Sequence, residues 1–335
     1  MTRRVLVTGG AGYIGSVIVD QLLERGWSVF VLDDLSTGHR DAVARRASFV
    51  QGNVGNGELV EALLGQERID AIIHMAAFAL VPESVAQPGK YVTNNVTAAR
   101  VLLEAAVRAK IRRFVFSSSC AVYGHPAVIP ITEDAPQAPV NPYGETKRDF
   151  ENLLADCGPR NGLGVVSLRY FNAAGATEQR GEDHDPETHL IPNILAVALG
   201  KQPAVPVFGT DYPTADGTAV RDYIHVVDIA DAHVRALDVS LDGAAPVAVN
   251  LGTGAGQSVR QVIAAAGRVT GRPIPTVERP RRPGDPPALV AAVQRAATVL
   301  GWRTKHSSLE EILESAWQWH RAHPHGYRGG AGGGS

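Results

Sequence analysis

Short runs of apolar residues alternate with helical patterns through the first half of the chain. Five runs read as buried strands: 4–8 (RVLVT), 28–34 (SVFVLDD), 48–53 (SFVQGN), 70–77 (DAIIHMAA) and 112–119 (RRFVFSSS). The stretch 13–26 (YIGSVIVDQLLERG) predicts an amphipathic helix after the first run. Continuous β-branched runs joined by helices indicate parallel strands covered on both faces. A helix over about 143–156 and a strand over 164–170 extend the pattern to residue 172. We therefore predict an α/β fold with a Rossmann-like, doubly wound parallel sheet.

The second half of the chain is richer in Pro and Gly, as in 200–218 and 271–287. Helical patterns recur near 190–199, 228–238, 257–270 and 308–322. We predict a first domain over 1–172 and a smaller C-terminal α/β substrate lobe over 173–328. Segments near 220–250 are candidates to pack back on the first domain. The Gly-rich tail 329–335 has no apolar surface to bury and is predicted to be disordered.

The composition is that of an ordinary globular protein, and it narrows the choice of partners. The chain has 335 residues and a net charge of −2, with 44% hydrophobic and 20% charged residues. This near-neutral balance argues against nucleic acid or an acidic membrane surface as the main partner. No apolar stretch approaches the roughly 18 residues of a membrane span, and the start shows no signal pattern. Two cysteines, Cys120 and Cys157, cannot form a disulfide framework, so we expect a reducing cytoplasm.

A glycine-rich turn follows the first predicted strand and opens the first helix (TGGAGYIG, 8–15). Gly10, Gly12 and Gly15 fit the dinucleotide spacing, with Gly9 as an additional glycine. Glycines allow a tight turn and close approach of a pyrophosphate to the free N–H groups of a helix N-terminus. Asp33 ends the next strand, where a carboxylate accepts hydrogen bonds from a ribose diol and repels a 2′-phosphate. The alternative is a plain glycine turn with a capping acid; the strand–turn–helix context favours NAD, and NAD over NADP.

The stretch NPYGETK (141–147) places a phenol and an ammonium on one face of a predicted helix, because Tyr143 and Lys147 are four residues apart. A tyrosine with a pKa of about 10 is a poor base near neutrality. A lysine ammonium, with a positively charged nicotinamide nearby, favours the phenolate and lowers that pKa. Ser119 ends the fifth predicted strand at the same sheet edge and offers a hydroxyl. The alternative is a solvated helix face, but together with the glycine turn these groups predict oxidation of a secondary alcohol.

The loop GEDHDPETH (181–189) contains two histidines and several carboxylates without the spacing of a known metal motif. We expect a solvated acidic loop there, and no metal site.

Several longer motifs carry a resemblance that runs from residue 4 to about 321. They are VTGGAGYIGS, DDLSTG, FSSSCAVYG, NPYGETK, LRYFNAAGA, HLIP, VFGTDYPTADGTAVRDYIHVVDIA, NLGTG and RRPGDPPALV. The chain resembles the extended short-chain dehydrogenase/reductase family, and within it the UDP-hexose 4-epimerases. The first and fourth motifs belong to the whole superfamily, whereas the VFGTDYPTADGT block and RYFNAAGA are more specific to the 4-epimerases.

The resemblance implies a role for individual residues. Ser119, Tyr143 and Lys147 would be the catalytic residues. The NAD site would comprise Gly9, Gly12, Tyr13, Ile14, Asp33, Asn53, Val54, Ala76, Asn94, Lys147 and Tyr170. The UDP-sugar would contact Ser119, Tyr143, Phe171, Asn172, Leu190, Arg221, Arg282, Asp285 and Leu289. Arginine suits this second set, because its planar fork matches diphosphate oxygens. The family also implies a homodimer through helices near 90–109 and 143–156.

The implied reaction is NAD-dependent epimerisation at C4 of UDP-glucose or UDP-galactose through a transient 4-keto sugar. Asn53, Ala79 and Leu289 depart from residues common in the family (Asp, Lys and Tyr). Leu289 leaves room for an N-acetyl group, so UDP-GlcNAc and UDP-GalNAc are expected as a second pair. The alternatives are an epimerase of UDP-xylose/UDP-arabinose or of a UDP-uronic acid, and a catalytically silent NAD sensor. Dehydratases place an acidic pair where this chain has Cys120 and Ala121, which argues against elimination.

Overall fold

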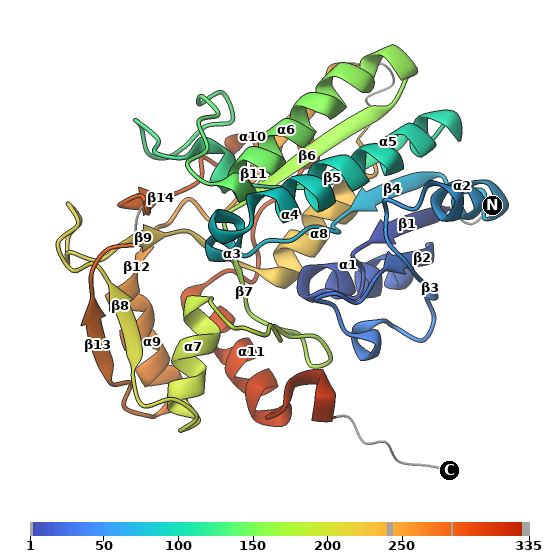
Figure 1. Ribbon diagram of the computed structural model, residues 1–335. Coiled ribbons are helices and arrows are strands. Elements are labelled where there is room, and N and C mark those ends of the chain that lie inside the picture. The colour runs from blue at the N-terminus through green and yellow to red at the C-terminus, as the bar shows by residue number, and fades with distance from the viewer. Residues whose placement is uncertain (1–2, 240–243, 283, 330–335) are drawn as a thin grey trace, which may run out of the picture.

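A seven-stranded parallel sheet forms the centre of the molecule (Figure 1). The computed structural model describes residues 3–239, 244–282 and 284–329. Along the sheet the strands follow the order β11 (Val247–Leu251), β6 (Gly164–Tyr170), β5 (Arg113–Ser119), β4 (Ala71–His74), β1 (Arg4–Thr8), β2 (Ser28–Asp33) and β3 (Ser48–Gln51). The chain order reverses between β1 and β4, which is where doubly wound sheets bind ligands. The predicted fold class is confirmed.

Alternate residues of each strand feed two separate apolar layers. In β1, Val5 and Val7 belong to one buried cluster and Leu6 to the other. One face is covered by α1 (Tyr13–Glu24), α8 (Val226–Ala236) and α10 (Gln294–Leu300). The opposite face is covered by α2 (Gly57–Gln66), α5 (Ala99–Arg108) and α6 (Pro142–Cys157). Figure 1 shows α5 and α6 on one side of the sheet and α1 on the other. Both faces of the sheet are therefore buried under helices, which explains the continuous apolar runs in the sequence.

Part of the second half of the chain returns to this sheet. β11 pairs with β6, with Val249 opposite Leu168, and α8 packs against α1. Helix α8 and strand β11 thus lie against the first half of the chain, and a division at residue 172 stays a prediction. Residues 240–243 lie outside the described part of the chain.

The segment between β4 and β5 carries three short helical pieces ahead of α5. They are α3 (Val81–Ala86), α4 (Pro88–Val92) and a π-helical turn, η2 (Thr93–Ala98). Helix α6 begins with Pro142 in its first turn, and the Asn141 side chain accepts a hydrogen bond from the Gly144 N–H at 2.9 Å. This cap and the proline fix where the helix starts. They thereby fix the position of Tyr143 in its first turn.

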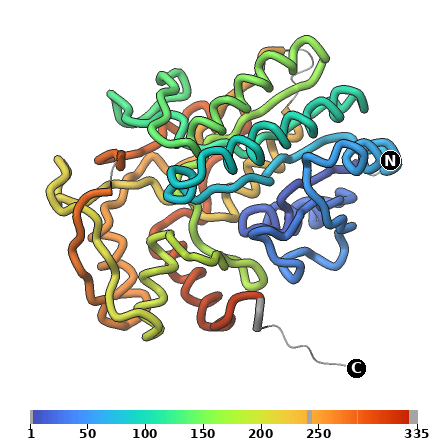
Figure 2. Tube along the Cα trace, in the orientation of Figure 1, coloured from blue at the N-terminus to red at the C-terminus, as the bar shows by residue number. Residues whose placement is uncertain are grey.

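The remaining chain builds a smaller lobe around a third apolar cluster. Its helices are α7 (Leu190–Ala198), α9 (Val259–Thr270) and α11 (Leu309–Ala322). Its strands form three small sheets: β8 (Val205–Phe208) with β13 (Thr276–Arg279); β9 (Val220–Arg221) with β12 (Gln257–Ser258) and β14 (Ala288–Leu289); and β7 (Asn172–Ala174) with β10 (Tyr223–His225). In Figure 2 this lobe lies at the lower left, in yellow-green, yellow, orange and red, beside the central sheet.

Four 3₁₀ turns complete the described structure: η1 (Arg40–Ala42), η3 (Cys120–Tyr123), η4 (Pro159–Asn161) and η5 (Gly326–Gly329). Of the Gly-rich tail, residues 330–335 lie outside the described residues. Within the described ranges, the helices are too short or too polar to cross a membrane.

Candidate active site

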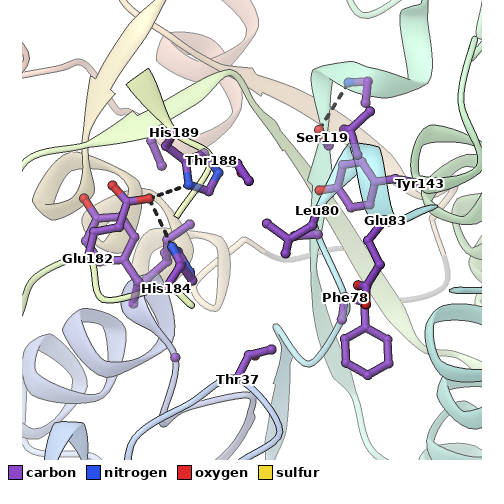
Figure 3. A pocket seen from close by; sticks show the side chains of 18 of the residues that line it. Thr37, Phe78, Leu80, Glu83, Ser119, Tyr143, Glu182, His184, Thr188 and His189 are labelled. Carbon is purple, nitrogen blue, oxygen red and sulfur yellow. Dashed lines mark hydrogen bonds and ion pairs between the residues drawn. The ribbon is translucent and has the colours of Figure 1, made fainter. Parts of the chain in front are cut away.

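A cavity of about 860 Å³ opens between the carboxyl edge of the sheet and the smaller lobe. With one exception, every residue that the sequence assigned to catalysis, cofactor or substrate lines it. The exception is Lys147, which lies behind Tyr143. Figure 3 shows Ser119 and Tyr143 on one side of the cavity, facing Glu182, His184 and His189 on the other.

Two glycines of the β1–α1 turn are required by the backbone itself. Gly9 has φ +71°, and a Cβ there would lie 2.6 Å from the backbone N of Ala76. A Cβ on Gly15 would lie 2.2 Å from the carbonyl oxygen of Gly9. Gly10, which the sequence spacing had assigned to the dinucleotide turn, packs against Val31 and does not line the cavity. Gly9 lines the cavity instead.

Gly12 differs: apart from its chain neighbours, the Gly9 carbonyl oxygen at 3.4 Å is the only atom of the described residues within 4 Å of a Cβ there. A methyl group would therefore project into the cavity, at the N-terminus of α1, where Gly12 is the capping residue. A cradle that a Cβ would fill, with unpaired helix N–H groups facing it, fits a dinucleotide diphosphate.

Asp33 ends β2 at the rim of this cradle. Its carboxylate accepts hydrogen bonds from the backbone N–H groups of Ala11 at 2.9 Å and Leu35 at 2.8 Å. Leu35 is held in the left-handed region at φ +60°, a conformation that costs a non-glycine residue free energy. Burial raises the pKa of Asp33, and the two backbone hydrogen bonds oppose that shift. A buried carboxylate that lines the cavity and has free acceptor capacity suits a ribose diol.

Several other predicted cofactor residues around the cradle already form hydrogen bonds within the protein. Tyr13 donates its hydroxyl to the Gly175 carbonyl at 2.5 Å, which ties the turn to the strand β7. The Asn53 amide is already engaged, donating to Asp34 at 2.8 Å. Asn94 donates to Asn95 Oδ1 at 3.1 Å. The Asn53 side chain must therefore share or exchange its contact with Asp34 to reach an adenine. Ile14, Val54 and Ala76 supply apolar lining.

Tyr143 and Lys147 lie on one face of α6, as their spacing predicts, but the ammonium reaches past the ring. Lys147 Nζ donates to the Ser117 carbonyl at 2.8 Å and lies 5.7 Å from the centroid of the Tyr143 ring. Ser119 Oγ accepts a hydrogen bond from the Ala121 N–H at 3.2 Å. Tyr170 shares a 2.7 Å hydrogen bond with the Ser117 hydroxyl. The end of β5 thus holds the amine and the hydroxyl groups in place.

The electrostatics of this group differ from the expectation that a lysine beside the ring lowers the pKa of Tyr143. Burial raises the pKa of Tyr143, and only the hydrogen bond with Ser119 opposes it appreciably. Burial also lowers the pKa of Lys147 to about 7, so much of the positive charge is lost near neutrality. In the chain by itself, burial therefore opposes formation of the phenolate, and a positive charge in the cavity would favour it.

A buried ion pair holds α6 against the sheet one turn beyond Lys147. Arg169 of β6 and Glu151 of α6 are 5% and 8% exposed, and their closest N–O distance is 2.5 Å. Arg169 also donates to the Tyr123 hydroxyl at 2.9 Å, and Tyr123 donates to Asn250 of β11 at 2.7 Å. Breaking such a buried pair is costly because one charge stays behind. The network therefore fixes the helix that carries Tyr143.

The predicted substrate residues come from the smaller lobe and from the chain after β6. Arg221 pairs with Asp285, and the Arg282 guanidinium lies 4.1 Å from the centre of the Phe208 ring. Phe171 and Leu289 are buried in one apolar cluster that forms a wall of the cavity. Asn172 begins β7, and Leu190 begins α7. Two guanidinium groups and an apolar wall are thus brought to one end of the cavity.

The expectation of a solvated loop over 181–189 is wrong for Glu182, which is buried, whereas Asp185 and Pro186 are exposed and the residues around them are partly exposed. The Glu182 side chain is only 6% exposed, and His184, His189 and Glu187 gather around it. Burial raises the pKa of Glu182, but His189 and His184 outweigh that effect and hold it below its usual value. The signal present in the sequence was the repeated pairing of a histidine with a nearby acid. Their proximity in space depends on the fold of the loop.

The glycine cradle, the acid after β2 and the Tyr–Lys–Ser group together define a dinucleotide-dependent enzyme of the Rossmann-like α/β class. The chain belongs to the NAD dependent epimerase/dehydratase family, whose model matches residues 5–252. The resemblance drawn from the sequence motifs is thereby confirmed, and so is NAD as the cofactor.

Three relatives place the chain more closely. It is 49% identical over 326 residues to the UDP-glucose 4-epimerase of Lactobacillus helveticus, covering 97% of this chain and 99% of that one. The crystal structure of the Brucella ovis UDP-glucose 4-epimerase with NAD is 45% identical, with a TM-score of 0.91 over 97% of this chain and 99% of that one. The Bifidobacterium longum enzyme with NAD⁺ and UDP is 38% identical, with a TM-score of 0.92 over 96% and 99%.

Proposed function

We propose that this chain catalyses NAD-dependent epimerisation at C4 of a UDP-hexose, interconverting UDP-glucose and UDP-galactose through a transient 4-keto sugar. The observation that carries the proposal is the content of one cavity. A dinucleotide cradle, a buried phenol with its serine, and two arginines all face the same space. The UDP-glucose 4-epimerases that resemble the chain over nearly its whole length favour this reaction over the other nucleotide sugars and over a silent sensor.

Bound NAD supplies the acceptor and donor of hydride and a positive ring charge near Tyr143. We assign Tyr143 to accept the proton of the sugar 4-hydroxyl and to return it when the sugar is reduced on its other face. Ser119 orients that hydroxyl, and its hydrogen bond favours the phenolate. Lys147 is held beside the ring by the Ser117 carbonyl, where its remaining positive charge acts in the same direction.

The other end of the cavity would hold the UDP group while the sugar turns. Arg221 and Arg282 supply planar forks that match diphosphate oxygens, although Arg221 must first share its contact with Asp285. Phe171 and Leu289 present an apolar surface to the moving ring. Because Leu289 has no aromatic ring, we extend the proposal to UDP-GlcNAc and UDP-GalNAc.

We also propose a homodimer, a cytoplasmic location, and a division into an NAD-binding part (1–172) and a UDP-sugar part (173–328). The dimer would pair the region of α4 and α5 with α6 across a two-fold axis; Val92, 49% exposed on α4, offers apolar surface there. The cytoplasmic proposal rests on Cys120 and Cys157, which are both free. Light scattering after size exclusion tests the dimer, and a monomeric mass would refute it.

The test of the function is a panel of UDP-glucose, UDP-GlcNAc, UDP-xylose and UDP-glucuronate, each incubated with the protein and resolved into products. We expect UDP-galactose from UDP-glucose. The matched variant is Tyr143→Phe, which keeps the buried ring and removes the proton acceptor. Its turnover should fall by the ~10² to 10⁴ typical of general-base catalysis, with folding and NAD content unchanged. Near-normal turnover in this variant would refute the assignment of Tyr143 as the proton acceptor.

A further inference from the structure

We propose that Glu182, His184, Glu187 and His189 form a four-ligand binding site for a divalent transition-metal ion of the Zn²⁺ type. The site lies in the loop before α7, on the cavity wall that faces Ser119 and Tyr143 (Figure 3). It goes beyond the proposed epimerase reaction, in which these four residues have no part.

The four side chains lie close enough together to converge on one tetrahedral ion after small side-chain movements. Zn²⁺ binds His nitrogen at about 2.0–2.1 Å and carboxylate oxygen at about 2.0–2.2 Å, which places neighbouring ligand atoms about 3.4 Å apart. His189 Nδ1 lies 2.9 Å from Glu182 Oε1 and 3.0 Å from Glu187 Oε1. His184 Nδ1 lies 3.3 Å from Glu182 Oε1 and 3.8 Å from Glu187 Oε2. All four ligand atoms lie within 4.8 Å of one another.

The ligand types select the ion. Two imidazole nitrogens with two carboxylates suit Zn²⁺ and related transition metals, whereas Mg²⁺ and Ca²⁺ prefer oxygen ligands alone. The Nδ1 atom of His184 is buried and forms no hydrogen bond within the described residues, although two carboxylates lie nearby. Among the described residues, the ion-pair partners of both carboxylates are histidines, and Lys201, which lines the same second cavity, pairs with neither of them.

We infer an entry path that does not cross the catalytic cavity. A second cavity of about 470 Å³ lies on the other side of the loop, and Glu182, His184 and Glu187 line it. His320, His323 and His325 line the same cavity, so an arriving cation meets further nitrogen donors before it reaches the loop. A metal site needs such a path.

Four protein ligands leave no open position, so the ion would have a structural role. His189 is the residue before α7, and Leu190, the first residue of α7, lines the catalytic cavity. The ion would therefore fix the loop 181–189 to the start of α7 and stiffen the wall opposite Tyr143. It would take no part in the chemistry.

The experiment is a titration of chelator-treated, NAD-containing protein with Co²⁺, followed by displacement with Zn²⁺. Tetrahedral Co²⁺ absorbs visible light strongly, so the wild type should develop this absorption with one ion per chain. Excess Zn²⁺ should abolish it and raise Tm. His184→Gln and Glu187→Gln should each weaken binding by at least the ~10- to ~100-fold that follows removal of an outer-shell partner. His325→Gln is the matched control and should bind as the wild type does.

Three outcomes would overturn the site. No Co²⁺ binding by the wild type, or only the weak absorption of octahedral Co²⁺, would refute a four-ligand site. Unchanged binding in both His184→Gln and Glu187→Gln would place the ion elsewhere. Loss of binding in His325→Gln would assign the metal to the C-terminal histidines. The wild-type titration stands by itself if a variant fails to fold, and none of these readouts depends on epimerase activity.

Discussion

The same added methyl group should have opposite consequences at two glycines of the cradle, Gly12 and Gly15. At Gly15 the new Cβ would lie 2.2 Å from the Gly9 carbonyl oxygen and 3.0 Å from the Gly10 Cα, both backbone atoms. The turn must then shift by about 1 Å to restore van der Waals contact, and overpacking of this kind costs about 1–3 kcal/mol. We expect Gly15→Ala to lose that much free energy of unfolding, together with NAD.

At Gly12 the nearest protein atom would be 3.4 Å from the Cβ, and φ is −81°, which alanine adopts freely. Alanine is a poorer N-cap than glycine and destabilises the folded state by about 0.5–1 kcal/mol. It also restricts the unfolded chain, which stabilises the protein by about 0.4–1 kcal/mol. The free energy of unfolding should therefore change by less than about 1 kcal/mol. The methyl group nevertheless occupies the cradle, so Gly12→Ala should be purified without NAD.

Gly65→Ala in α2 is the matched control, because nothing lies within 4 Å of a Cβ at that exposed helix position. It should gain about 0.5–1 kcal/mol and keep its NAD. The assays are urea unfolding of the NAD-free proteins, since bound NAD stabilises only the variants that retain it, and NAD released on denaturation. If Gly12→Ala retains wild-type NAD, the diphosphate does not lie against this turn. If Gly15→Ala is as stable as Gly65→Ala, the close approach in the turn is not rigid.

Three further substitutions test other parts of the account. Leu289→Tyr should abolish turnover of UDP-GlcNAc while largely sparing UDP-glucose, because a clash excludes the larger substrate; equal loss of both, or no wild-type turnover of UDP-GlcNAc, would refute it. Burial lowers the pKa of Lys147 from 10.5 to about 7, which corresponds to a loss of about 5 kcal/mol in the free energy of unfolding. This loss is complete below pH 7, where the lysine is charged in both states, and it shrinks as the pH rises toward 10.5. Lys147→Met removes this loss but also removes the hydrogen bond to Ser117, which is worth about 1–3 kcal/mol. The variant should therefore raise the free energy of unfolding by roughly 2–4 kcal/mol at pH 6 and by less at pH 9. An equal gain at both pH values would contradict this. Glu151→Gln leaves the buried Arg169 unpaired and should cost about 3–5 kcal/mol in urea unfolding, whereas a loss below about 1 kcal/mol would mean that the pair does not hold α6.

Local sequence patterns were sufficient for six strands of the central sheet (β1 to β6) and for helices α1, α6, α7, α8, α9 and α11. The run 4–8 is β1 without change, and the stretch 308–322 is α11 with one residue less. β11 was not predicted as a strand, because its place depends on Val249 meeting Leu168, far away in the sequence. The apolar run of β11 is short, and its pairing partner is determined by the free edge of β6 in the folded sheet.

The candidate site shows the same division between local and distant information. Helical spacing correctly put Tyr143 and Lys147 on one face, but the effect of burial on both pKa values depends on what covers α6. Asn53 was expected in the NAD site, and the fold gives its amide Asp34 as a first partner. The loop 181–189 looked solvated because its residues are polar, and only the structure buries Glu182 among histidines.

The most direct test of the account is the balance between sugar product and NADH, measured with no NAD added. Purified protein should release NAD on denaturation, in proportion to chain. Reactions started from UDP-glucose and from UDP-galactose should converge on one mixture of the two sugars, while absorption by NADH does not grow with product. This is the result expected if Tyr143 serves a hydride that leaves C4 and returns to it. Accumulation of one NADH for each product molecule, with turnover that stops unless NAD is added, would show a dehydrogenase and contradict the central claim.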